Sequence, residues 1–245
     1  MKDVLEGLRE FQSSYVPNNQ DLLTALAKDQ HPRVLFVACS DSRVPPELIT
    51  QSEPGELFVI RNAGNIIPPY GATNGGEGAT VEYAIKSLDI RQVIICGHTT
   101  CGAMKGLLQV GELENTMPLV YSWLKHTEAT RELVEENYGH LGKAEKLSTL
   151  IAENVLTQIE NLRTYPIVRS RLHTHKITIH GWIYNIEDGS VVTYDRENHT
   201  FVPLFETYDP DSDGGVYEQL KENYRGSSRL SQTQRDRIYY GSPTF

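Results

Sequence analysis

Val34-Leu35-Phe36-Val37-Ala38 is an uninterrupted apolar run, and a polar segment that opens with Cys39 follows it. A second run of this kind, Gln92-Val93-Ile94-Ile95, leads directly to Cys96. Apolar strands without alternation are typical of parallel sheets, because helices cover both faces of such sheets. Helical patterns separate the runs, so we expect an α/β fold with a mostly parallel β-sheet core flanked by helices.

The other expected elements follow the same pattern. Residues 57–60 are a further apolar run, and this run and residues 176–184 are both expected to be strands. Residues 190–194 follow the second of these across Glu187-Asp188-Gly189, which is a hairpin signal. Residues 119–165 have a helical pattern with a turn signal near their middle. The chain is therefore expected to add an antiparallel strand to its parallel sheet.

The chain divides into an N-terminal helical arm (1–29), a core domain (30–205) and a C-terminal extension (206–245). In the arm, apolar residues recur at helical spacing up to residue 12, Pro17-Asn18-Asn19 is expected to end this helix, and a second helix is expected over residues 20–27. These helices either clamp their own subunit or reach onto a partner, and we favour the partner.

The C-terminal extension differs in composition from the rest of the chain. Its Asp-, Gly- and Ser-rich segments have the character of a linker. Its arginines form either a solvated face or a binding surface, and the adjacent Tyr239 and Tyr240 favour a partner, because arginine and aromatic residues anchor interfaces. The arginines are Arg225, Arg229, Arg235 and Arg237.

Charge and cysteine content exclude several classes of protein. The net charge of −9 argues against nucleic acid as a bulk electrostatic partner. Three cysteines in 245 residues do not form a disulfide framework and suit a reducing compartment. The N-terminus has charges throughout and no apolar signal core, so a cytoplasmic protein is expected.

Two of the cysteines and one histidine form a candidate metal site. Cys39 follows the first apolar run, while His98 and Cys101 follow the second. Open α/β sheets place their sites at the carboxyl ends of the strands, and zinc prefers thiolate and imidazole ligands. Taken singly, these residues could equally be core thiols or a helix cap, and Cys96, within its strand, is expected to be a core cysteine.

Asp41 and Arg43 follow Cys39 within four residues. A carboxylate there could accept a hydrogen bond from water at an open fourth position on the metal, and an arginine could keep that carboxylate ionised. The alternative is a surface ion pair of little consequence. Their position beside Cys39 favours the catalytic interpretation.

At these residues the chain resembles the β-class carbonic anhydrases. The motifs are Cys39-x-Asp41-x-Arg43 and His98-x-x-Cys101, with Arg61-Asn62-Ala63-Gly64-Asn65 between them, and the resemblance runs from about residue 30 to residue 194. It implies one Zn²⁺ per subunit, bound by Cys39, His98 and Cys101, with Asp41 and Arg43 as the catalytic dyad. It also implies that residues 30–205 are the catalytic domain.

The resemblance further implies a substrate pocket. A glutamine that binds substrate in plant-type members corresponds to Gln30, and its presence favours a site that Asp41 leaves open. The apolar carbon dioxide pocket corresponds to Phe58, Ala63 and Tyr83, and Gly102 is assigned to substrate binding with them. Ala63 is smaller than the valine common in the family, which changes the expected shape of the pocket. Both subunits of a family dimer contribute to the pocket, so a homodimer or higher homo-oligomer is expected.

The flanking segments resemble the cyanobacterial carboxysomal branch of the family. They are the N-terminal arm, residues 119–130 and residues 237–242. This resemblance implies a cytoplasmic enzyme inside the carboxysome, whose C-terminal extension docks on a scaffold protein. The extension is compact for the branch.

The expected function is zinc-dependent reversible hydration of carbon dioxide to bicarbonate and a proton. Two alternatives remain at this point. One is a hydrolase of a similar molecule, carbonyl sulfide or carbon disulfide, on the same fold. The other is a scaffold-binding module with a structural zinc, against which the Asp41–Arg43 pair argues.

Overall fold

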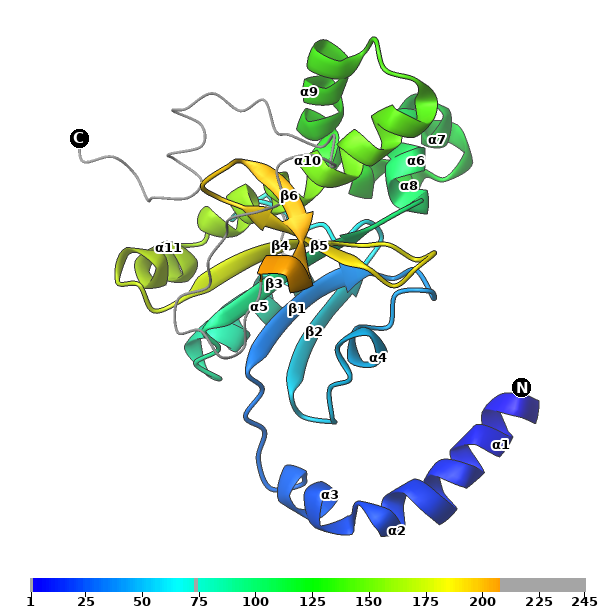
Figure 1. Ribbon diagram of the computed structural model, residues 1–245, viewed down its shortest axis with the longest axis vertical. Helices are drawn as coiled ribbons and strands as arrows, with labels where there is room; N and C mark the ends of the chain where they lie inside the picture. Colours follow the sequence, from blue (N-terminus) through cyan, green and yellow to red (C-terminus); the bar gives the residue numbers. More distant parts are fainter. Residues whose placement is uncertain (1, 73–74, 208–245) are drawn as a thin grey trace.

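One six-stranded sheet forms the core of the computed structural model, which describes residues 2–72 and 75–207 (Figure 1). The strand order is β2-β1-β3-β4-β5-β6. Strands β2, β1, β3 and β4 run parallel, and β5 and β6 add antiparallel pairs, which confirms the expected fold class. The strands are β1 (Val34–Cys39), β2 (Leu57–Asn62), β3 (Gln92–His98), β4 (Thr178–Tyr184), β5 (Val191–Asp195) and β6 (Thr200–Pro203).

The expected hairpin is formed by β4 and β5, with Trp182 opposite Thr193. Strand β6 was not expected, because it has only four residues and ends in a proline. The turn before it is stabilised by Asp195, whose Oδ1 accepts hydrogen bonds from the backbone N–H groups of Glu197 and Asn198.

Helices surround the sheet and fill the connections between strands (Figure 1). The expected helical region 119–165 is divided by a short 3₁₀ turn at Lys125–Thr127 and by the turn before α10. The helices after the first strand are α4 (Pro46–Thr50), α5 (Gly76–Lys86), α6 (Gly102–Leu108), α7 (Val110–Thr116), α8 (Pro118–Leu124), α9 (Glu128–Tyr138), α10 (Lys143–Arg163), α11 (Pro166–His173) and α12 (Leu204–Thr207).

Helix α10 lies close against β3 and β4, and two glycines make this approach possible. A Cβ atom at Gly97 would lie 2.8 Å from Val155 Cγ2, and one at Gly181 would lie 2.9 Å from Val155 Cγ1. Real Cβ atoms essentially never come so close. The glycines therefore let the longest helix pack directly on the sheet backbone.

Alternation along β1 decides which face of the sheet carries Cys39. Leu35, Val37 and Cys39 belong to the large core cluster that includes the buried residues of α10. Phe36 and Ala38 belong to a second cluster on the opposite face. Since successive strand residues point to opposite faces, Cys39 projects toward α6 and α10.

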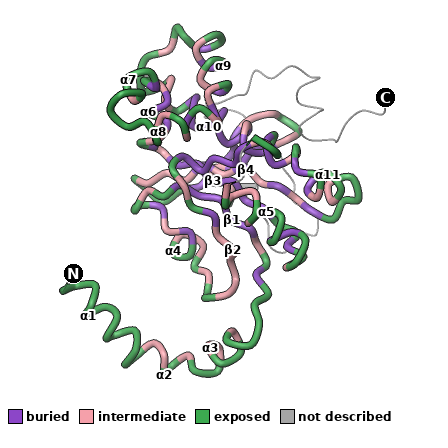
Figure 2. The backbone as a smooth tube through the Cα atoms, turned by 180° about the vertical axis from the view of Figure 1, so that it is seen from behind, coloured by how far each residue is buried: buried purple, intermediate pink, exposed green. Residues whose placement is uncertain are grey.

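The N-terminal helices lie apart from the sheet and are largely exposed (Figures 1 and 2). They are α1 (Lys2–Glu10), a π-helical turn (Phe11–Tyr15), α2 (Val16–Asn18) and α3 (Gln20–Leu26). The arm helix ends within the expected Pro17-Asn18-Asn19 segment: it continues to Asn18 and turns at Asn19. The π-helical turn ends two residues before Pro17. Proline lacks an N–H and cannot complete a regular α-helical hydrogen bond.

Within residues 2–72 and 75–207, no helix combines the length and the apolar character needed to cross a membrane.

Candidate metal centre

The three candidate ligands meet at the carboxyl edge of the parallel sheet. Cys39 is the last residue of β1, His98 is the last residue of β3, and Cys101 lies just before α6. Strands β1 and β3 are paired, so their ends lie side by side. One ligand atom from each residue lies within 4.8 Å of the others, and all three residues are buried. The structure thus brings together the ligand set expected from the sequence.

His98 has the orientation of a metal-binding imidazole. Its Nδ1 lies 3.0 Å from the carbonyl oxygen of Thr99, which can only accept a hydrogen bond, so the proton belongs on Nδ1. Its Nε2 is then a lone-pair donor, and it is buried without a hydrogen-bond partner among the described residues. An unpartnered buried nitrogen is costly unless something binds it. A soft divalent cation between this nitrogen and the two thiols fits that requirement.

The two cysteines of the cluster share a hydrogen bond. Hydrogen bonding from Cys101, and to a smaller extent from the Gly64 backbone, lowers the pKa of Cys39 despite its burial. The same shared hydrogen bond, together with burial, raises the pKa of Cys101. One negative charge is therefore already favoured in the cluster. A metal ion in place of the shared proton would allow both sulfurs to be thiolates.

Asp41 is held beside the cluster by Arg43. The arginine Nε lies 2.9 Å from Asp41 Oδ1 and its Nη2 lies 2.7 Å from Oδ2. These bonds hold the pKa of the Asp41 carboxyl well below its usual range. Asp41 Oδ2 is 3.9 Å from the unpartnered His98 Nε2. Asp41 and Arg43 therefore form a bidentate ion pair at the edge of the cluster. The Asp41 side chain is 16% exposed, so this is not a fully solvated surface ion pair.

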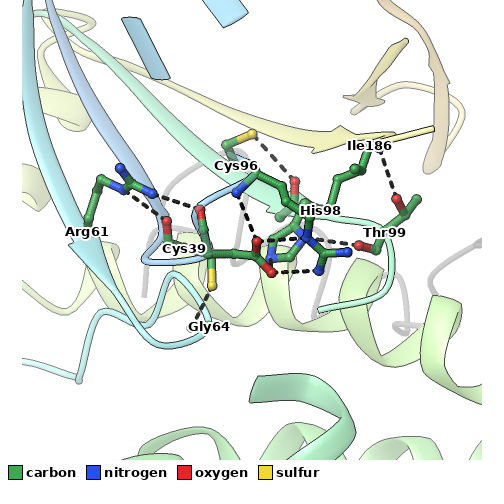
Figure 3. A network of polar contacts seen from close by, with 10 residues as sticks. Cys39, Arg61, Gly64, Cys96, His98, Thr99 and Ile186 are labelled. Carbon is green, nitrogen blue, oxygen red and sulfur yellow. Dashed lines mark hydrogen bonds and ion pairs between the residues drawn. The ribbon is translucent and has the colours of Figure 1, made fainter. Parts of the chain in front are cut away.

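Arg61 supports the same loop from the neighbouring strand β2, a role that sequence reasoning missed. Its Nε donates to the carbonyl of Cys39 at 3.1 Å and its Nη2 donates to the carbonyl of Asp41 at 2.8 Å (Figure 3). Arg61 is paired in register with Ala38 on β1. An arginine at the end of a strand next to the ligand-bearing strand was the available signal.

The loop after β2 covers the cluster, and amide side chains of α10 hold this loop. Gly64 donates its N–H to Cys39 Sγ at 3.4 Å (Figure 3). Asn154 donates to the carbonyl of Gly64, Gln158 accepts from the N–H of Ile67, and Asn161 donates to the carbonyl of Ile67. These amides lie one helical turn apart along α10 and form what we call the amide stripe. The loop is thus fixed to a helix distant in sequence.

The expected substrate residues lie in different surroundings. Phe58 and Tyr83 contact each other, with ring centroids 6.0 Å apart, and Tyr83 is exposed. Gly102 is the first residue of α6, next to Cys101, and Ala63 precedes Gly64 in the covering loop. Gln30 is exposed between α3 and β1, and its described hydrogen bond joins its backbone N–H to Asp29.

Cys96 lies outside the candidate metal group. It is buried in the second core cluster, and its Sγ contacts the carbonyl of Gly97 at 3.4 Å. Burial raises the pKa of this thiol to about 12. These features agree with the expected core role.

Comparison with known proteins defines the class to which this fold and site belong. The family model described as carbonic anhydrase matches residues 34–191. A carbonic anhydrase of Synechocystis is 58% identical over 202 residues, which span 82% of this chain and 74% of that protein. A carbonic anhydrase of Synechococcus elongatus is 60% identical over 196 residues, which span 80% of this chain and 72% of that protein. The chain therefore belongs to the carbonic anhydrase family and is an enzyme of carbon dioxide hydration.

A solved structure shows to which class of carbonic anhydrases the chain is similar. The structure of the β-carbonic anhydrase CcaA superposes with a TM-score of 0.82 at 58% sequence identity, covering 83% of this chain and 98% of that chain. The β class, expected from the motifs, and its cyanobacterial branch, expected from the flanking segments, are thereby confirmed.

Proposed function

We propose that this enzyme hydrates carbon dioxide reversibly with one Zn²⁺ per subunit, held by Cys39, His98 and Cys101. The observation that carries the proposal is the buried, unpartnered Nε2 of His98 beside two thiols, with all three ligand atoms within 4.8 Å. Two thiolates and an imidazole leave the fourth position of a tetrahedral ion free, which is typical of catalytic rather than structural zinc.

Zinc, when bound, would lower the pKa of water toward neutrality and so supply the nucleophile. Asp41 would accept a hydrogen bond from that water and orient its lone pair toward carbon dioxide. Arg43 keeps Asp41 ionised and, by holding both of its carboxylate oxygens, keeps it away from the ligand position. This pairing supports the form of the site that Asp41 leaves open.

The proposed substrate pocket takes Phe58, Ala63, Tyr83 and Gly102 as its lining and Gln30 as a hydrogen-bond donor to a substrate oxygen. Gln30 precedes the amino end of β1, whereas the proposed ligand Cys39 is the last residue of that strand. A second copy of the chain is therefore the proposed source of the Gln30 that serves each site.

The first test separates the ligands from the dyad. Asp41→Asn should retain about one zinc per subunit and lose most carbon dioxide hydration near neutral pH, because the amide cannot replace an ionised acceptor. Cys39→Ser should lose zinc, because a hydroxyl is a poor ligand for this ion. Stopped-flow hydration assays and metal analysis of the purified proteins measure both effects. Unchanged turnover in Asp41→Asn, or unchanged zinc in Cys39→Ser, would contradict the respective assignment.

We also propose a carboxysomal role, in which the C-terminal extension (206–245) docks on a scaffold protein. The support is the similarity to CcaA and to the cyanobacterial relatives, together with the Arg and Tyr content of the extension. The extension lies outside the described residues, apart from its first two positions.

Truncation after residue 205 tests this role. The truncated enzyme should retain hydration activity in solution and lose its enrichment in carboxysomes when expressed in a cyanobacterial host. A truncated protein that still concentrates there would exclude the extension as the docking segment.

A further inference from the structure

The hydrogen bond from Gly64 to Cys39 belongs to a longer chain of contacts. The peptide group that joins Ala63 to Gly64 offers two polar atoms, a carbonyl oxygen and an N–H. The N–H donates to Cys39 Sγ at 3.4 Å. The carbonyl oxygen of the same group accepts a hydrogen bond from Trp123 Nε1 at 2.8 Å. The indole N–H, the peptide and the sulfur are thus connected in series, and a donor on the carbonyl polarises the N–H toward the sulfur.

Asn154 fixes the other peptide group of Gly64. Its Nδ2 donates to the Gly64 carbonyl at 3.0 Å. Its Oδ1 accepts bonds of 2.8 Å from Thr127 Oγ1 and from Gln158 Nε2. A carbonyl can only accept, so this amide has one consistent orientation, and its donor side faces the loop. Asn154 itself is buried, with 1% of its surface exposed.

Gly64 would otherwise be an easily rotated link. It has a φ of 86°, a region that favours glycine, and a Cβ atom there would lie 2.9 Å from Met104 Cε. A larger residue, which would restrict the backbone rotation at this position, does not fit here. The direction of its N–H must therefore be set by the groups that bind its two flanking peptides.

We infer that Trp123 and Asn154 are positioning residues for the Cys39 thiolate, acting through the two peptide groups of Gly64. This inference rests on the proposed function, because it assigns these residues to a sulfur proposed to bind zinc. Hydrogen bonds to a metal-bound sulfur lower its electron donation and fix its direction, and loss of such outer contacts commonly costs tenfold or more in metal affinity.

The principal test is Trp123→Phe in the full-length protein, prepared with zinc and with cobalt(II). Phenylalanine keeps an aromatic ring against His126, which lies 5.6 Å away in an edge-to-face arrangement, and removes the N–H. The expected results are a shift of the sulfur-to-cobalt charge-transfer absorption to longer wavelength and about tenfold weaker zinc affinity in chelator competition.

Trp182→Phe is the matched control. The Nε1 of Trp182 is buried, and it has no hydrogen-bond partner among the described residues. The control removes the same atoms from the protein without removing a donor to the cluster. It should leave the cobalt spectrum and the zinc affinity unchanged.

A second pair of variants tests Asn154. Asn154→Asp keeps the acceptor for Thr127 and Gln158 and removes the donor to Gly64. Asn161→Asp makes the same chemical change in the donor to the carbonyl of Ile67, which lies three residues after Gly64 in the loop. Both should lower the melting temperature, but only Asn154→Asp should shift the cobalt spectrum. If Asn154→Asp does not fold, Trp123→Phe decides the inference alone.

The outcomes separate this inference from the proposed function. A wild-type protein that binds neither zinc nor cobalt would overturn the proposed function, and the inference with it. A wild-type protein that binds metal, beside a Trp123→Phe variant with the same spectrum and the same zinc affinity, would overturn the inference alone.

Discussion

The carboxyl group of Glu153, on α10, has almost no access to water. It is 4% exposed, and its described hydrogen-bond partner is the hydroxyl of Tyr138, 3.5 Å away. Burial, which disfavours the ionised form, raises the pKa of Glu153 to about 7. The carboxyl group in the folded protein is therefore neutral in mildly acidic solution and must ionise in a buried place as the pH rises.

Glu153→Gln should therefore stabilise the protein at pH 8 and have little effect at pH 4. Because the folded pKa is raised above the unfolded value, the favourable contribution is complete below about pH 4.5 and is lost as the pH rises through about 7. The difference in unfolding free energy at pH 8 is expected to be up to about 3 kcal/mol. Urea denaturation of both proteins between pH 4 and pH 8 measures it.

Glu136→Gln, at an exposed position of α9, is the matched control. It replaces an exposed side chain, and surface substitutions usually change stability little, so it should not reproduce the gain expected for Glu153→Gln at pH 8. A pH-independent effect of Glu153→Gln would show that the buried carboxyl does not titrate as described.

Among the site residues, the sequence predicted those whose positions are set by the strands of the sheet. Cys39 and His98 end adjacent parallel strands, so their convergence follows from the strand pattern. Trp123 and Asn154 could not be predicted to act there, because each reaches the loop only through the way its helix packs. Neither an indole N–H nor a buried amide has a sequence signature for such a contact.

Helix α10 packs unusually close to the backbone of strands β3 and β4. Its Val155 side chain occupies the space that a Cβ atom at Gly97 or Gly181 would need. A helix seated directly on strand backbone cannot retreat without opening a cavity elsewhere, since interiors are close-packed.

Gly181→Ala should therefore destabilise the fold by about 1–3 kcal/mol, because the added methyl group would also lie 3.1 Å from Ile159 Cδ1. Gly111→Ala in α7 is the control, since no atom lies within 4 Å of the added carbon. There the change should be neutral or stabilising by up to about 1 kcal/mol. Urea denaturation compares the two, and equal stability of Gly181→Ala and wild type would contradict this account of the packing.

Elements with a continuous apolar run were predicted well from the sequence, and elements defined by local geometry were not. The apolar runs of β1 and β3 had no competing interpretation. Strand β6 is too short to show alternation, and it depends on the Asp195 turn for its position. The π-helical turn of the arm, at Phe11–Tyr15, was also not predicted, because no residue pattern indicates such a turn.

The arm presents an apolar surface that no other described residue of the chain covers. Helix α1 has no buried residue, and Val4, Leu5, Leu8 and Phe11 are between 45% and 68% exposed. The helical run from Lys2 to Asn18 buries none of its residues, whereas most helical stability in proteins comes from the packing of an apolar face. We therefore expect the arm to pack on a second copy of the chain.

The double variant Leu5→Ser and Leu8→Ser should weaken self-association. Losing the burial of two leucines is expected to cost about 2–4 kcal/mol, which corresponds to at least about thirtyfold in the dissociation constant. Sedimentation velocity over a dilution series measures this constant.

Lys2→Ser with Glu6→Ser is the control on the same helix. These residues form an exposed ion pair at 3.8 Å, which contributes little in water. If the leucine variant dissociates no more readily than this control, the arm is not an association surface.

The amide stripe also limits how this enzyme can be redesigned. The stripe and the loop that it holds are separated by as many as 94 residues in the chain. A designer who transplanted the cysteine-covering loop into another scaffold would leave behind the helix that gives the loop its shape. The smallest portable unit is therefore loop and helix together, and libraries that vary one should vary the other in step.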